Sequence, residues 1–192
     1  FTTWMSDAVA ANEPEPNAMC LATVSAEGRP SARFVLLKGF DERGFVWYTN
    51  YESRKAYDLA SNPAAALTFW WAGLERSVRI EGDAVRVSEE ESDEYFESRP
   101  PQSRLGAWVS DQSRPISGRE GLERRWSELE KMYFDDSGNV IKTIPRPPHW
   151  GGFRIVPTRM EFWKGRASRL HDRIVFERKD PSHAWCITRL QP

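Results

Sequence analysis

The chain has few of the side chains that hold metal ions or form disulfide bridges. Of its 192 residues, two are cysteine and three are histidine. His149, His171 and His183 lack the short spacing of a zinc motif, and no cysteine pair joins them, so we expect no metal site. Cys20 and Cys186 lie in separate apolar runs typical of strands, and we expect both to be free, buried thiols.

Several familiar signatures are also missing. No GxGxxG, Walker-type or Gly-x-Ser-x-Gly segment occurs, which argues against dinucleotide-binding, P-loop and α/β-hydrolase folds. Basic and aromatic residues are interleaved, as in proteins that bind single-stranded nucleic acid. A formal net charge of −1, however, favours neither nucleic acid nor an anionic membrane as a partner.

The apolar runs are of strand length, too short to span a membrane as a helix. No signal peptide is visible, and we expect a cytoplasmic protein. Targeting to an organelle by residues upstream of Phe1 stays open, because the chain does not begin with methionine.

The chain is rich in hydrophobic and aromatic residues. Hydrophobic residues make up 40% of it, including nine Trp and ten Phe. This supply is enough to bury a sizeable core, and we expect one domain over residues 1–192. Aromatic side chains mostly fill cores, but they also form the walls of pockets for flat ligands.

Hydrophobic periodicity and turn residues predict a mainly β fold with flanking helices. Expected strands cover residues 18–24, 33–38, 45–50, 64–71, 74–87 (with a bulge at Gly82), 151–157, 159–163, 173–178 and 184–190. Helices are expected near residues 2–9, 53–60, 88–98, 104–109 and 117–133, two of them opened by capping boxes at Ser88/Glu91 and Ser117/Glu120. Strands and helices do not alternate as in βαβ units, which indicates a β-barrel with helices around it.

The stretch from Arg33 to Lys55 combines apolar runs with basic ends. The first run predicts a buried strand with Arg33 and Lys38 at its rims, and the turn that ends at Gly44 predicts that the next run is its hairpin partner. Arg54 and Lys55 then open a predicted helix, whose free backbone N–H groups favour an anion. The same residues also fit a plain hairpin and a helix with solvated basic side chains.

Two further clusters could carry chemistry. In an extended segment Arg169, His171 and Arg173 share one face, which could hold an anionic substrate beside an imidazole. A polar strand end with ordinary salt links fits these residues as well. Tyr95, Arg99 and Ser103 place hydroxyl and guanidinium groups around a predicted helix end, which is weak evidence when taken alone.

Together these motifs resemble the pyridoxamine 5'-phosphate oxidase family, from about residue 4 to residue 192. The resemblance is carried by Arg33-Phe-Val-Leu-Leu-Lys38, Tyr48-Thr-Asn50, Ser53-Arg-Lys55, Tyr95-Phe-Glu-Ser-Arg99, Gln112-Ser113, Trp150-Gly-Gly152, Glu161-Phe-Trp163 and Arg169-Leu-His-Asp-Arg173. Each motif is short, but their shared order and fitting separations are highly specific.

The resemblance implies an FMN-binding split β-barrel that forms a homodimer, with FMN at the subunit interface and a C-terminal dimerisation and substrate region at about residues 150–192. It also implies a reaction of vitamin B6 salvage. Pyridoxine or pyridoxamine 5'-phosphate is oxidised to pyridoxal 5'-phosphate, and O₂ accepts the electrons and becomes hydrogen peroxide.

The resemblance further implies which residues bind each partner. The expected FMN contacts are Arg33, Phe34, Val35, Leu36, Leu37, Lys38, Tyr48, Thr49, Arg54, Lys55, Ser77, Gln112, Ser113, Trp163 and Arg173. The expected substrate contacts are Lys38, Tyr95, Arg99, Ser103, Arg169, Leu170 and His171, with Arg169 and His171 at the reacting carbon.

Two positions depart from the family pattern. Ser77 and Lys164 stand where glutamine is usual, and a serine is too short to make the same hydrogen bond to a flavin. Weaker FMN retention or an altered flavin potential is therefore expected. Two alternatives remain: a related FMN oxidase of secondary metabolism, acting for example on phenazine precursors, and a non-catalytic flavin- or pyridoxal-phosphate-binding protein.

Overall fold

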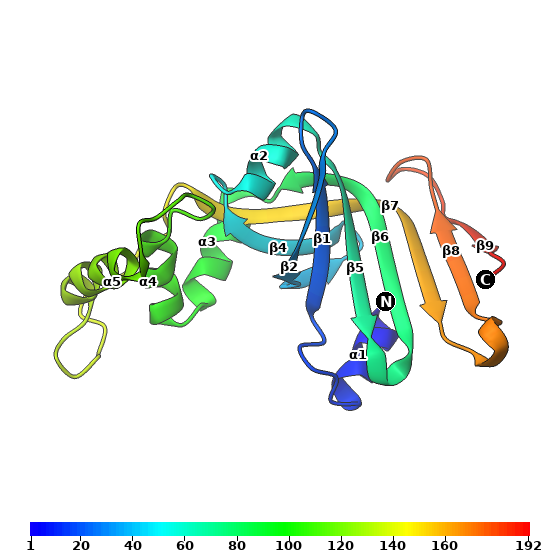
Figure 1. The fold of residues 1–192 in the computed structure, drawn as a ribbon, viewed down its shortest axis with the longest axis horizontal. Helices are drawn as coiled ribbons and strands as arrows, with labels where there is room; N and C mark the ends of the chain where they lie inside the picture. The colour runs from blue at the N-terminus through cyan, green and yellow to red at the C-terminus, as the bar shows by residue number, and fades with distance from the viewer. The chain divides into compact units, whose positions relative to one another are not determined.

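The computed structural model describes all residues, Phe1–Pro192, and it is mainly β with flanking helices (Figure 1). The strands are β1 Ala18–Val24, β2 Pro30–Leu36, β3 Gly39–Asp41, β4 Gly44–Asn50, β5 Ala64–Trp71, β6 Arg76–Arg86, β7 Trp150–Lys164, β8 Asp172–Glu177 and β9 Cys186–Arg189. The helices are α1 Thr2–Ala10, α2 Arg54–Ser61, α3 Glu89–Ser98, α4 Pro101–Val109 and α5 Arg119–Tyr133, with 3-10 turns η1 Ala72–Leu74 and η2 Ala167–Arg169.

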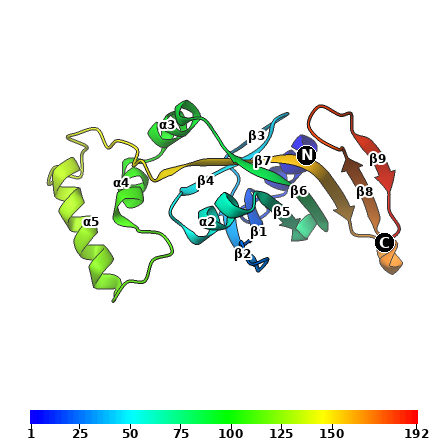
Figure 2. The same cartoon turned by 90° about the horizontal axis from the view of Figure 1, so that it is seen from above.

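The chain divides into two compact units. The first contains Phe1–Trp47, Asp58–Val85 and Arg154–Pro192, and the second contains Tyr48–Tyr57 and Arg86–Phe153. The strands form one hydrogen-bonded series in the order β2-β1-β5-β6-β7-β4-β3, with β8 paired to β7 and β9 to β8. Figure 2 shows β8 and β9 beside the C-terminal part of β7, all within the first unit.

The first unit is built on strands whose alternate side chains are buried. On β1 these are Met19, Leu21 and Thr23, each fully shielded from solvent. Alternation puts such residues on one face of the sheet, where removal of apolar surface from water stabilises the fold. Strands β5 and β6 follow the same rule and bury Leu67, Phe69, Trp71, Val78 and Ile80.

The run beginning at Arg33 is a strand, but the prediction that it is buried is wrong. β2 has a single neighbour, β1, so its other edge is open, and Phe34 is 80% exposed. The predicted hairpin partner is also wrong: β2 pairs with β1, Phe34 lying opposite Cys20, whereas the short β3 forms the hairpin with β4. Lys38 follows β2 and pairs only through its backbone N–H, which donates to Val46 O at 2.9 Å.

β7 runs through the position where two separate strands were predicted. Pro157 lies inside it, and its carbonyl oxygen accepts a hydrogen bond from Arg178 Nε at 2.8 Å. The bulge predicted at Gly82 is absent from the β5–β6 pairing, whose register runs unbroken from Ala64 to Trp71. Gly82 has another role: a Cβ atom there would overlap the carbonyl oxygen of Val156.

In the second unit, one of the two predicted helix N-caps is present. Ser88 caps α3 as predicted, its hydroxyl accepting from the Glu91 backbone N–H at 3.1 Å. The capping box predicted at Ser117 is wrong, because Gly118 occupies the N-cap position and no side chain caps α5. Helices α4 and α5 enclose a small apolar core of Leu105, Tyr133, Phe134 and Ile144, with Trp108, Trp126 and Leu129 around it.

Both cysteines are free, as predicted, but they are not both buried. Cys20 is half-buried on β1, and Cys186 is exposed because β9 has β8 as its only neighbour and every residue of β9 faces solvent. No helix combines the length and apolar character that a membrane span requires.

The close approach at Gly82 leads to a prediction about stability. We expect Gly82→Ala to lower the free energy of unfolding by about 1–3 kcal/mol, because the β7 backbone must shift to admit a methyl group. Gly39→Ala is the matched control, since no heavy atom lies within 4 Å of the added carbon. Urea unfolding of both variants provides the measurement, and equal stabilities would contradict the steric argument.

Candidate functional site

The predicted ligand-binding residues fall into groups within each unit. In the first unit, a cleft of about 420 Å³ gathers three of the predicted cofactor residues, Ser77, Trp163 and Arg173. Strand register explains why, since Trp163 lies opposite Arg173 in the β7–β8 pair and Ser77 lies opposite Trp70 in the β5–β6 pair. The complete lining is Trp70, Ser77, Arg79, Glu161, Trp163, Arg173 and Pro192.

The walls of this cleft suit a flat ligand that carries negative charge. Trp163 and Trp70 supply indole rings, with centroids 6.0 Å apart, and Arg79 and Arg173 supply positive charge. The volume falls within the range of about 300–1,000 Å³ that small-molecule sites occupy. The residues present therefore fit a planar, anionic cofactor such as FMN.

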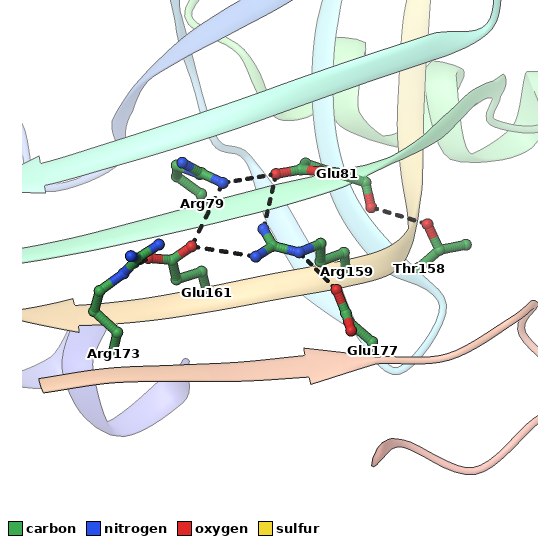
Figure 3. A network of polar contacts seen from close by, with 7 residues as sticks. All are labelled: Arg79, Glu81, Thr158, Arg159, Glu161, Arg173 and Glu177. Carbon is green, nitrogen blue, oxygen red and sulfur yellow. Dashed lines mark hydrogen bonds and ion pairs between the residues drawn. The ribbon is translucent and has the colours of Figure 1, made fainter. Parts of the chain in front are cut away.

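Glu161 lies close to three arginine side chains in this region (Figure 3). Its side chain is 5% exposed, and its Oε1 accepts from Arg173 Nε at 2.7 Å. Oε2 lies 3.4 Å from guanidinium nitrogens of Arg79 and of Arg159. The hydrogen bond from Arg173 lowers the pKa of the Glu161 carboxyl from its ordinary value, so this group is ionised at neutral pH.

The segment that ends at Arg169 is not extended, so the prediction that Arg169 lies on an extended strand face with His171 and Arg173 is wrong. Arg169 ends the η2 turn with a φ of 61°, and the preceding Ser168 has a φ of 58°. This left-handed turn breaks the alternation of side chains. Arg169 and Leu170 are exposed, Leu170 to 70%.

His171 nevertheless lies beside the cleft, packed on one of its walls. Its ring centroid is 4.7 Å from that of Trp163. Its Nδ1 lies 3.1 Å from the backbone nitrogen of Arg166, which donates to it. Nδ1 must then act as an acceptor, so the neutral ring carries its proton on Nε2.

The strand expected to run beside the flavin has its arginine engaged within the sheet. Arg33 Nη1 donates to Thr23 Oγ1 at 2.7 Å, and Thr23 in turn donates to Asp58 Oδ2 at 2.6 Å. Thr23 and Asp58 are buried, and sequence reasoning missed both as partners of Arg33. The neighbouring Phe34, Leu36 and Lys38 are exposed, and Leu37 is buried.

In the second unit, the predicted residues Thr49, Lys55 and Gln112 come together. Lys55 is 9% exposed, and its Nζ lies 3.0 Å from Thr49 Oγ1 and 2.9 Å from Gln112 Oε1. Arg54, the first residue of α2, is exposed. Ser113 lies in the loop after α4 with a φ of 70°. The buried ammonium and the start of α2 favour an anion here.

The second unit also brings together Tyr95 and Arg99, which were predicted to hold a substrate phosphate. Tyr95 stacks on Tyr48, with ring centroids 3.9 Å apart, and the Arg99 guanidinium lies 4.6 Å from the centroid of Trp150. Arg99 Nη1 is buried without a hydrogen-bond partner, and burial lowers the pKa of this guanidinium. An unpaired buried donor is costly unless a ligand satisfies it, so the arrangement fits an anion. Ser103 is exposed on α4.

Sequence reasoning missed several residues that contribute to these groups. Arg79 could have been found, because it lies two residues after Ser77 and alternation puts both on one face of β6. Trp150 and Glu161 belong to recognised motifs, yet no role followed for them from sequence. Their partners come from distant segments and become visible only in the folded chain.

Comparisons with known proteins identify the relatives of this chain. Residues 5–133 match the family described as pyridoxamine 5'-phosphate oxidase, and residues 150–192 match the pyridoxine 5'-phosphate oxidase C-terminal dimerisation region. A pyridoxine/pyridoxamine 5'-phosphate oxidase from Nostoc punctiforme is 59% identical over 192 residues, which is all of this chain and 86% of that protein.

Two solved structures show the same fold. PhzG from Burkholderia lata 383, in complex with tetrahydrophenazine-1-carboxylic acid, has a TM-score of 0.91 at 32% identity, covering 100% of this chain and 90% of that one. A pyridoxamine 5'-phosphate oxidase-related, FMN-binding protein from Nostoc punctiforme has a TM-score of 0.77 at 18% identity, covering 99% and 96%. The predicted split-barrel fold is thereby confirmed.

Proposed function

Because this chain belongs to the pyridoxamine 5'-phosphate oxidase family, we propose that it oxidises pyridoxamine and pyridoxine 5'-phosphates to pyridoxal 5'-phosphate, with FMN as cofactor and O₂ as electron acceptor. The observation that carries the choice of substrate is the buried, unpartnered Nη1 of Arg99. Planar guanidinium groups bind phosphate through two parallel hydrogen bonds, and Tyr95 and Ser103 of the same unit would add hydroxyls.

Both sets of predicted cofactor residues have chemistry that suits FMN. Trp163 offers an apolar wall and Arg173 a cation in the first unit, and Arg54 and Lys55 at the start of α2 suit a phosphate. Bound FMN would supply the redox chemistry, taking a hydride from the substrate and returning the electrons to O₂ as hydrogen peroxide. The dimerisation region at 150–192 supports a homodimer, and we place FMN at its interface and treat residues 1–192 as one oxidase domain.

The remaining residues would orient the substrate. Arg169 and His171 would face the carbon that loses the hydride. The imidazole would present its Nε2 proton, because Nδ1 is held by the Arg166 backbone. In hydride transfer to a flavin, the protein contributes mainly by holding the reacting carbon of the substrate against the flavin ring.

A second candidate is an oxidase of phenazine precursors, favoured by the structural likeness to PhzG. A substrate without a phosphate would leave Arg99 Nη1 buried and unpaired, which argues for the phosphorylated vitamers. The third candidate is a non-catalytic binding protein. That function would not explain why the chain has both Arg169 and His171, the residues predicted to lie at the reacting carbon.

The reaction can be tested directly. We expect the purified protein, reconstituted with FMN, to show a flavin spectrum and to release hydrogen peroxide with pyridoxine 5'-phosphate. Peroxide formation with dihydrophenazine carboxylic acids alone would instead support the second candidate. Bound flavin without turnover of either substrate would support a binding protein.

Arg99 should control recognition of the phosphate. We expect Arg99→Lys to raise the KM for pyridoxine 5'-phosphate about 10–100-fold, because lysine lacks the planar pair of donors. Arg86→Lys is the matched control: Arg86 also stacks on an aromatic ring, 4.0 Å from the centroid of Tyr51, but has no proposed contact with substrate. Steady-state kinetics measure both variants, and equal KM values would refute the assignment.

Ser77 should limit the affinity for FMN. We expect Ser77→Gln to bind FMN about 3–10-fold more tightly, since the longer amide can add one hydrogen bond to the flavin. Titration of FMN into apo-protein, followed by quenching of flavin fluorescence, gives the dissociation constants. Ser137→Gln, on an exposed turn, should not change them. Unchanged affinity in Ser77→Gln would remove the significance of this departure.

A further inference from the structure

We propose that Glu161 is a positioning residue, a buried carboxylate that fixes Arg173 and Arg79 in the orientation in which they line the cleft. This inference rests on the proposed function, because it concerns the same FMN site. Glu161 projects from β7 between the strands that carry the two arginines, β6 and β8 (Figure 3).

The geometry at Arg173 shows how its orientation is set. Nε donates to Glu161 Oε1 at 2.7 Å, and Nη1 donates to the Gln191 carbonyl oxygen at 3.1 Å. A guanidinium is planar, so hydrogen bonds at two of its nitrogens define the plane of the whole group. These two hydrogen bonds do not use the third nitrogen, Nη2, and Arg173 lines the cleft, so Nη2 is the nitrogen that we assign to a ligand there.

Arg79 is held by the same carboxylate from the other side. Its Nη2 lies 3.4 Å from Glu161 Oε2 and 3.0 Å from Glu81 Oε1. Arg79 is half exposed and carries a flexible side chain. Without these two carboxylates it would sample many rotamers, and ordering it on binding would weaken the ligand's affinity.

A third arginine explains why the cleft keeps its positive character. Arg159 lies near three carboxylates, at 3.0 Å from Glu81, 2.8 Å from Glu177 and 3.4 Å from Glu161. Arg159 therefore forms ion pairs with all three carboxylates of the network, although it does not line the cleft. Arg79 and Arg173 share their carboxylate partners with Arg159 and can still attract an anionic ligand.

Replacing Glu161 by glutamine tests the effect of its negative charge separately from the effect of its size. Glu161→Gln keeps the size of the side chain, but it removes the charge and can turn an N–H group toward the guanidinium groups. We expect FMN to dissociate about tenfold more readily from this variant and the midpoint potential of the bound flavin to change, because its arginine neighbours lose their fixed placement. Fluorescence titration and potentiometry measure the two quantities.

Glu177→Gln is the matched control. Glu177 belongs to the same network through Arg159, but it touches neither Arg79 nor Arg173 and does not line the cleft. We expect its FMN affinity and flavin potential to equal those of the wild type. A loss as large as that of Glu161→Gln would show a general structural effect and overturn the inference.

A double-mutant cycle tests whether Glu161 acts through Arg173. We expect Glu161→Gln to weaken FMN binding far less in an Arg173→Lys background than in the wild type, because the group that it orients has been replaced. Additive losses would overturn the proposal. Thermal unfolding accompanies each variant, and Glu161→Asp, which retains the charge but falls short of Arg173, replaces Glu161→Gln if that variant does not fold.

The outcomes for the wild type and the variant separate this inference from the proposed function. If the wild-type protein binds no FMN on reconstitution, the proposed function falls and this inference falls with it. If the wild-type protein binds FMN and Glu161→Gln binds it equally well, the inference alone is overturned.

Discussion

The cleft of the first unit depends on how closely backbones approach β7. At Gly44 and Gly82, an added side-chain carbon would overlap the carbonyl oxygens of Ile155 and Val156, two consecutive residues of that strand. Glycine permits a separation that no other residue allows. Just beyond this point β7 passes through Pro157 and pairs with β8, and its next residues include Glu161 and Trp163. The part of β7 that carries the aromatic wall and the charge network thus begins a few residues after these two close approaches.

Buried charge is the second constraint, and it is met in a similar way in several places. Asp58 is placed near Arg33, Glu161 near Arg173, and Lys55 near the side-chain oxygens of Thr49 and Gln112. A charge removed from water is costly unless hydrogen bonds compensate for it, so these contacts leave each cation little freedom to move. Residues that must meet an anionic ligand in a defined orientation benefit from that restriction.

Much of the architecture could be predicted from the sequence, because apolar runs and their Gly, Pro and Asn boundaries mark elements locally. The strand at residues 18–24 and the helix that stops before Asn62 are examples. The edge position of β2 could not be predicted. An apolar run indicates burial, yet Phe34 is exposed in a single chain. Apolar side chains on an open edge strand are an exception to the rule that an apolar run is buried.

In the candidate site, too, some residues could be predicted from local sequence and others could not. Motif residues such as Ser77, Trp163 and Arg173 were predicted from sequence, and the fold brings them to one cleft. The residues that hold them in place were not predicted, because pairs such as Glu161 with Arg79 depend on strand register between distant segments. The left-handed turn at Ser168 and Arg169 was not predicted, for a different reason. Left-handed backbone at non-glycine residues has no simple sequence signal, and alternation was assumed where the chain turns.

Membership of a family fixes the fold more firmly than it fixes the substrate. PhzG shares the fold with this chain, and its structure holds tetrahydrophenazine-1-carboxylic acid, so the fold alone does not identify the substrate. Discrimination must then come from individual polar groups. A site with a buried, unpaired donor such as Arg99 Nη1 rejects a ligand that cannot satisfy it much more strongly than an apolar wall rejects a ligand of slightly different size. Trp150, stacked against that guanidinium, shields the donor from water and so increases the difference. In the function proposed above, the choice between a phosphorylated vitamer and a phenazine precursor would rest more on the environment of Arg99 than on the cleft of the first unit.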